Sequence, residues 1–268
     1  ITKEFPKHQF AWKVLGVVFK LKGRTNESLV ALQKSVQLEP QDSEAHNNLG
    51  NTLKEQGKLK EAEVSFRKAI TLKPYFAKAH NNLGNTLKVL NRLKEAEVSY
   101  RKAILLKPDF AEAHNNFAAL LVELKKLEEA EVSYRKAILL KPDYAEAHNN
   151  FGTLLVELKK LEEAETFFKK AIEFKPDFIE AKHLLSALTG KTTNSAPRKY
   201  VETLFDDYAA NFENSLVNTL EYKTPNKIIE IIIDKNPNIQ LGSVLDLGCG
   251  TGLIGDEIKK YCSNLEGV

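Results

Sequence analysis

The sequence predicts an all-α array of stacked helix pairs, followed by the beginning of an α/β domain. The first observation is a repeat: the tetrapeptide Ala-His-Asn-Asn returns every 34 residues, beginning at Ala45, Ala79, Ala113 and Ala147. The second is a longer motif, Glu-Ala-Glu-Val-Ser-Phe/Tyr-Arg-Lys-Ala-Ile, which begins at Glu61, Glu95 and Glu129. Self-similarity at a fixed period of this length is typical of helical repeats, each of which buries its apolar face against the next.

Five units follow from this period, at residues 9–42, 43–76, 77–110, 111–144 and 145–178. Each holds two helical patterns, such as Ala45, Leu49 and Leu53 on one face of a first helix and Phe66 on the apolar face of a second. A small residue such as Gly50 lets the paired helices approach closely. We expect residues 1–8 to be the tail of a preceding unit that has been cut, and residues 179–188 to be a helix that caps the array.

Residues between the helices predict where each helix ends and the next begins. Gly57 and Asn91 suit the left-handed conformation that ends a first helix, and Lys125 and Lys159 occupy the same position at some steric cost. An Asp three residues before a Glu predicts a capping box at the start of three later first helices. These aspartates are Asp109, Asp143 and Asp177.

The repeated positions resemble those of the tetratricopeptide repeat family. In the second unit the matching residues are Leu49, Gly50, Ala62, Phe66, Ala69 and Pro74. The resemblance covers residues 9–178, and it implies a right-handed superhelix whose first helices line a concave groove that binds extended peptides.

One departure from the family is a histidine where a bulky aromatic residue is common. Trp12 fits the family pattern, but the later units have His46, His80, His114 and His148. Ligands of one zinc ion must lie about 2 Å from it, whereas equivalent residues of stacked repeats are a helix pair apart. We therefore interpret the histidines as packing residues and predict no metal site.

A polar stripe on the first helices is the candidate binding surface. It is an asparagine ladder of Asn48, Asn82, Asn116 and Asn150, with Asn51 and Asn85 on the same face. A carboxamide both donates and accepts, so it can pair with a peptide backbone of any sequence. The ladder is similar to that in the repeats of O-GlcNAc transferase. The alternative is that Asn is merely tolerated on a solvated face and copied with the repeat.

The first unit breaks this stripe. There its positions are occupied by Phe10, Val14, Val17 and Leu21. Either the groove turns apolar at this unit, or something outside the given sequence covers it.

Residues 189–197 form a polar linker, and residues 198–268 are predicted to be the incomplete N-terminal part of a second domain. The segment from Ser243 to Gly252, Ser-Val-Leu-Asp-Leu-Gly-Cys-Gly-Thr-Gly, predicts a strand and a glycine-rich turn that lead into a helix. Such a turn is a cradle for a nucleotide-like ligand, because glycine lets the backbone approach closely. The spacing of Gly250, Gly252 and Gly255 also fits a dinucleotide pattern for NAD, but Gly248 already ends the strand.

The string Leu-Asp-Leu-Gly-Cys-Gly-Thr-Gly resembles the first motif of class I S-adenosylmethionine-dependent methyltransferases, which have a Rossmann-like α/β fold. The resemblance implies that Gly248, Gly250 and Gly252 pass under the methionine part of S-adenosylmethionine and that Asp246 orients its amino group. The acid that holds the ribose in this family is not reached before Val268. We therefore expect the chain to hold only the truncated start of the enzyme and to be inactive by itself.

Charge distribution, cysteine content and the length of apolar runs limit the domain organisation, the compartment and the possible partners. Residues 195–268 hold 7 Lys and Arg against 11 Asp and Glu, and residues 1–194 hold 32 against 25, which indicates two units. No Arg-rich run indicates a nucleic-acid partner. The only cysteines, Cys249 and Cys262, fit a reducing compartment, and the longest apolar run is too short to span a membrane.

We predict a cytoplasmic module that binds a protein or peptide, fused to a methyltransferase; the alternative is a non-enzymatic scaffold with an inert domain remnant. The oligomeric state stays open.

Overall fold

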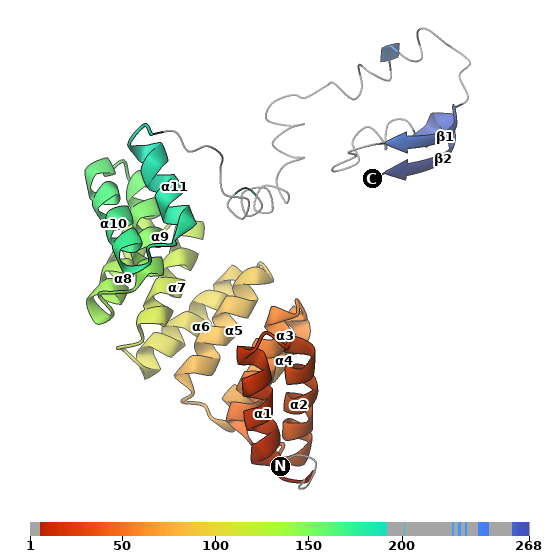
Figure 1. The fold of residues 1–268 in the computed structure, drawn as a ribbon, viewed down its shortest axis with the longest axis vertical. Coiled ribbons are helices and arrows are strands. Elements are labelled where there is room, and N and C mark those ends of the chain that lie inside the picture. Colours follow the sequence, from red (N-terminus) through yellow and green to blue (C-terminus); the bar gives the residue numbers. More distant parts are fainter. Residues whose placement is uncertain are drawn as a thin grey trace. The chain divides into compact units, whose positions relative to one another are not determined.

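The computed structural model describes residues 6–191, the single residues 201, 227, 230, 231 and 234, and residues 241–246 and 259–267. The chain divides into two compact units, residues 1–193 and 194–268, which are considered separately. Within the first unit the described chain is helical (Figure 1). The helices are α1 (Gln9–Leu21), α2 (Thr25–Leu38), α3 (Ser43–Glu55), α4 (Leu59–Leu72), α5 (Ala77–Val89), α6 (Leu93–Leu106), α7 (Ala111–Glu123), α8 (Leu127–Leu140), α9 (Ala145–Glu157), α10 (Leu161–Phe174) and α11 (Ile179–Leu188).

The helices pack as consecutive antiparallel pairs, from α1 with α2 to α9 with α10, as Figure 1 shows. First helices begin at Gln9, Ser43, Ala77, Ala111, Ala145 and Ile179, each 34 residues after the one before. Each second helix packs on the first helix of the next pair, and successive first helices from α1 to α9 also contact one another. This confirms the predicted all-helical superhelix of repeats. None of the described helices is long and apolar enough to cross a bilayer.

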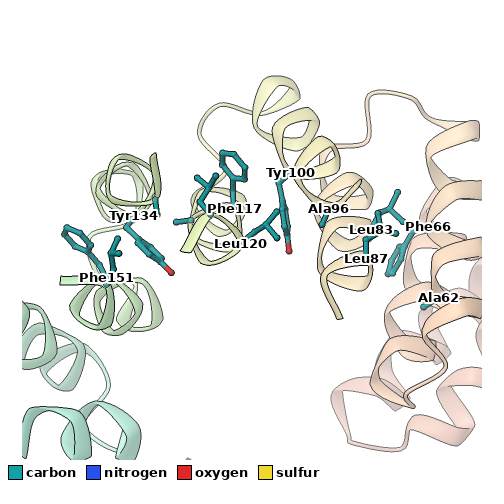
Figure 2. Close-up of a cluster of buried hydrophobic side chains, with 14 of the residues drawn as sticks. Ala62, Phe66, Leu83, Leu87, Ala96, Tyr100, Phe117, Leu120, Tyr134 and Phe151 are labelled. Atoms are coloured by element: carbon teal, nitrogen blue, oxygen red, sulfur yellow. The ribbon is translucent and has the colours of Figure 1, made fainter. Parts of the chain in front are cut away.

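Aromatic rings fill the space between the pairs. Phe66, Tyr100 and Tyr134 project from second helices into the apolar layer, where Leu83 and Phe117 lie beside them (Figure 2). The rings of Phe66 and Tyr100 are fully buried. Burying one such side chain contributes about 1.5–3 kcal/mol relative to leaving it in water.

Glycine on the first helix makes room for these rings. A Cβ added to Gly50 would lie 2.7 Å from Cε1 of Phe66, and one added to Gly84 would lie 2.7 Å from Cε1 of Tyr100. No real Cβ tolerates such a distance without movement, so the predicted close approach at Gly50 is confirmed.

The turns after the first helices have the predicted backbone conformation. Gly57 has φ of 73°, Asn91 of 57°, Lys125 of 59° and Lys159 of 60°. All four lie in the left-handed region, where a residue with a Cβ is strained and glycine is not. The two lysines therefore carry a local cost that the regular stacking of the units imposes.

The predicted capping boxes are wrong. The N-cap residues of α7, α9 and α11 are Phe110, Tyr144 and Phe178, one position after each aspartate, and none of them makes a side-chain cap. Phe110 is buried in an apolar cluster with Ala77, Ala103 and Ala113, and the ammonium of Lys107 lies 5.1 Å from its ring centroid. Burial of the aromatic ring therefore sets where the helix begins. An aspartate caps only α3, where Asp42 accepts from the N–H groups of Glu44 and Ala45.

In the second unit, two parallel strands are described. Strand β1 (Leu241–Asp246) pairs with β2 (Cys262–Gly267), which a short 3₁₀ helix, η2 (Lys259–Tyr261), precedes. Parallel strands need a crossover connection between them, and the predicted glycine-rich turn and helix fall in the stretch of sequence between β1 and β2. The strand before the glycine-rich turn is confirmed. Strand β2 pairs with β1 from Cys262, opposite Leu241, to Gly267, opposite Asp246.

Candidate peptide-binding face

The asparagine face consists of Asn48, Asn82, Asn116, Asn150, Asn51 and Asn85 on the first helices. Its ladder residues join successive units. Nδ2 of Asn82 donates to Oδ1 of Asn47 at 3.0 Å, and Nδ2 of Asn116 donates to Oδ1 of Asn81 at 3.1 Å. Asn150 donates in the same way to Asn115, also at 3.1 Å.

The second asparagine of one unit is therefore tied to the first asparagine of the unit before. Asn47, Asn81 and Asn115 are buried, and the ladder residues are half-buried. A buried carboxamide left without a partner would cost free energy, so each asparagine of the pair has a packing reason to recur. This structural role was missed at the sequence level, although the constant separation of 35 residues between partners was a usable signal.

The ladder residues keep part of their hydrogen-bonding capacity. Within residues 6–191, Oδ1 of Asn82 and Oδ1 of Asn150 accept no hydrogen bond, and Asn48 makes none at all. Oδ1 of Asn116 accepts only a long contact of 3.4 Å from Nδ2 of Asn115. Each carboxamide oxygen has two lone pairs, so the ladder still offers acceptors to a bound backbone.

One helical turn after the ladder position, the hydrogen bonds of the asparagine face differ between units. Oδ1 of Asn85 accepts from the hydroxyl of Tyr100 at 2.6 Å. The second unit has Phe66 in place of the tyrosine, and Asn51 has no hydrogen-bond partner in the described part of the chain. Burial raises the pKa of Tyr100, and the nearby Glu123 carboxylate raises it further, so the hydroxyl stays a donor.

Ion pairs flank the asparagine face. Lys20 Nζ lies 2.9 Å from Glu55, Lys88 Nζ lies 2.6 Å from Glu123, and Lys125 contacts Glu157. These pairs join neighbouring units and are open to solvent, where an ion pair contributes at most about 1 kcal/mol. They are therefore available for exchange with a charged partner.

At the first unit the face is apolar and open. The side chains of Phe10, Val14 and Leu21 are 58%, 43% and 82% exposed. No described residue covers them, so this end of the face is apolar within the described part of the chain, and a cover from outside this sequence stays the second expectation.

The recurring histidines hold unit junctions together. Nε2 of His46, His80, His114 and His148 lies 2.7–3.1 Å from the carbonyl oxygen of the proline six residues earlier. Trp12 donates from Nε1 to the carbonyl of Pro6 in the same way, at 2.9 Å. A carbonyl only accepts, so each histidine must carry its proton on Nε2 and replaces the tryptophan as a donor. The interpretation as packing residues is confirmed in this form. Across the described residues no group of three His, Cys, Asp or Glu side chains could hold a metal ion.

Family comparisons match the same part of the chain. Tetratricopeptide repeat profiles match residues 43–76, 77–110 and 121–188, and a TPR repeat profile matches residues 16–57. Together they cover more than half of the 268 residues. The chain belongs to the tetratricopeptide repeat family. No curated protein matches this tetratricopeptide repeat protein significantly.

Solved structures show the same fold. A structure of PilF from Pseudomonas aeruginosa has a TM-score of 0.62 at 21% identity and covers 84% of this chain and 97% of its own. TTC0263, a TPR protein of Thermus thermophilus, has a TM-score of 0.60 at 21% identity, covering 68% and 98%. YrrB, described as a TPR protein with an unusual peptide-binding site, has a TM-score of 0.51 at 23% identity, covering 68% and 94%.

The predicted cofactor site lies in the second unit of this tetratricopeptide repeat protein. Asp246 is the last residue of β1 and pairs with Gly267 of β2. Its place at the carboxyl end of a parallel strand is where α/β folds bind their ligands. Gly248, Gly250 and Gly252 lie outside the described residues.

Proposed function

We propose that the asparagine face binds an extended segment of a partner protein through backbone hydrogen bonds. The observation that carries the proposal is the unused acceptor capacity of Asn82 and Asn150 in side chains that the inter-unit bonds hold in place. A ligand gains affinity when the groups that receive it are ordered beforehand, because less side-chain entropy is lost on binding.

The spacing of the ladder supports an extended ligand. One carboxamide recurs per unit, on first helices that contact one another along the array. Backbone carbonyl and N–H groups recur at a regular interval in an extended chain, so one type of polar side chain can pair with them at every unit. YrrB, which has the same fold, is described as binding peptide, which is consistent with this use of the face.

Hydrogen-exchange footprinting with a short unstructured peptide tests where binding occurs. We expect protection in α3, α5, α7 and α9, with the solvent-facing second helices α4, α6 and α8 unchanged. Protection confined to the second helices would overturn the proposal, since it would place the partner on the opposite side of the array.

A second proposed function concerns residues 198–268. We propose that the domain to which these residues belong binds S-adenosylmethionine, which would supply a methyl group for transfer to an acceptor. The supporting observation is the parallel β1–β2 pair with Asp246 at the carboxyl end of β1. A carboxylate in that place fits the ammonium group of the ligand, as far as the described residues reach.

Titration calorimetry with S-adenosylmethionine on the chain carrying the complete domain tests this function. We expect a heat of binding that Asp246→Ala removes. No heat in the unsubstituted protein would favour the alternative, a scaffold in which this domain is inert.

A further inference from the structure

Charge reverses along the first helices. The first helices of units one to three, α1, α3 and α5, carry five lysines and two glutamates. The first helices of units four and five, α7 and α9, carry four glutamates and no lysine. The ladder asparagines are present in both halves, as Asn48 and Asn82 on α3 and α5 and as Asn116 and Asn150 on α7 and α9, so the ladder crosses a boundary between a basic and an acidic environment.

We call α7 and α9 the acidic half of the array. On these helices, glutamates lie both before and after the ladder asparagine. Glu112 and Glu146 lie one turn before Asn116 and Asn150, and Glu123 and Glu157 lie two turns after them. In the described chain Glu112 makes no ion pair, and Glu146 contacts only Lys175, at 3.3 Å with both side chains nearly half exposed. Carboxylates held so loosely can exchange their partners for basic side chains of a ligand.

In the basic half, α1, α3 and α5, three of the five lysines are ion-paired, whereas Lys54 and Lys78 make no ion pair in the described part of the chain. Lys78 is exposed without an ion pair in the described part of the chain. Burial lowers the pKa of Lys54 and repulsion from the nearby Lys20 lowers it further, which the carboxylate of Glu55 offsets only in part. An added carboxylate would relieve this repulsion, so acidic groups of a ligand are favoured here.

The apolar patch of α1 lies at the far end of the basic half. Phe10 and Leu21 are mostly exposed there, and Lys13 is paired with Asp42 at 2.8 Å. An apolar side chain placed on this patch would remove both surfaces from water.

We propose that the asparagine face binds a bipolar peptide in one orientation, with lysine or arginine side chains over α7 and α9 and an acidic, apolar segment over α1, α3 and α5. The proposal rests on the proposed peptide-binding function and adds the class and orientation of the partner to it. The carboxamide ladder would supply affinity without regard to sequence, and the charge reversal would supply the orientation.

The only tryptophan of the chain makes the orientation measurable. Trp12 lies on α1, at the end of the array opposite α9. The probe is a synthetic peptide with Leu and Asp in one half and Lys in the other, made in both backbone orders, with a dansyl group on either end. We expect energy transfer from Trp12 when the dansyl group is on the acidic, apolar end and much less when it is on the basic end. Equal transfer from both ends at saturation would overturn the proposed orientation.

Charge substitution supplies an independent test with a matched control. The variant Glu112→Lys with Glu146→Lys should weaken binding of the probe about tenfold. The control Glu128→Lys with Glu162→Lys makes the same change in net charge in the first turns of α8 and α10 and should bind like the unsubstituted chain.

The outcomes separate this proposal from the function on which it rests. Tight binding of the probe with the same affinity in both double variants would overturn the charge selection and leave peptide binding in place. If neither the probe nor a neutral unstructured peptide binds, the peptide-binding function fails, and this proposal fails with it.

Discussion

The carboxamide of Asn116 donates to the carboxamide of Asn81, 35 residues earlier, at 3.1 Å. This bond crosses from one repeat to the next, and its counterparts at Asn82 and Asn150 repeat it along the array. The ladder that we propose binds a peptide is thus also a set of links between units, and its role in stability can be separated by experiment from the proposed role in binding.

Replacing the buried partner tests the link. Asn81→Ala should lower the free energy of unfolding by about 1–2 kcal/mol, because it leaves the Asn116 donor without its acceptor. Urea unfolding measures the change. Asn51→Ala removes an asparagine that has no hydrogen-bond partner among residues 6–191, so it should change stability by less than about 0.5 kcal/mol. Equal losses in both variants would show that the inter-unit bond does not stabilise the fold.

The lysine at a left-handed turn predicts a stabilising substitution. Lys159 has φ of 60° and makes no ion pair in the described structure. Lys159→Gly should therefore raise the free energy of unfolding by about 0.5–1 kcal/mol. The reciprocal change Gly57→Lys, at φ of 73°, should lower it by a similar amount. The urea concentrations at which the two variants are half unfolded measure both changes. Shifts in the same direction would contradict the predicted cost of a lysine in the left-handed conformation.

The histidines predict an acid-sensitive fold. Burial lowers the pKa of His80, His114 and His148 below the ordinary 6.5, and a nearby lysine lowers each further. Nδ1 of His148 is buried without a partner among the described residues, so protonation there would bury an unpaired N–H. The unfolded chain then binds protons at a higher pH than the folded chain does. Stability should therefore fall as the pH drops below about 6.5.

Urea unfolding at pH 7.5 and at pH 5.5 measures this effect. The paired carboxylates Glu63, Glu97 and Glu131 have pKa values below the ordinary 4.5, so they stay ionised across this interval. Replacing His80, His114 and His148 by Gln should flatten the pH dependence. A dependence that persists in this variant would assign it to other groups.

Much of the fold could be predicted from the repeat. The period set the start of every first helix, and the need for a left-handed residue identified Gly57, Asn91, Lys125 and Lys159. The aspartate caps could not be placed correctly, since local capping preference competed with burial of Phe110 in a cluster that includes Ala77, a residue distant in the sequence. Tertiary packing therefore outweighed the local capping preference.

The candidate site was predicted only in part. The face of Asn48, Asn82, Asn116 and Asn150 was found from helical spacing, but its bonds to the buried asparagines join residues of different units. A pattern within one helix carries no information about such contacts. Whether Gly248, Gly250 and Gly252 form a cofactor cradle stays a prediction.

The most direct test of the central claim compares two triple variants in peptide binding. Asn82, Asn116 and Asn150 changed to Ala lose the inter-unit bonds and the ladder, whereas Asn47, Asn81 and Asn115 changed to Ala lose the same bonds and keep the ladder. Fluorescence titration with a short unstructured peptide should show affinity reduced roughly tenfold or more in the first variant, while the second, which loses the ordering of the ladder but not its carboxamides, binds more tightly than the first. Equal affinity in the two variants would contradict the claim that the asparagine ladder binds the partner.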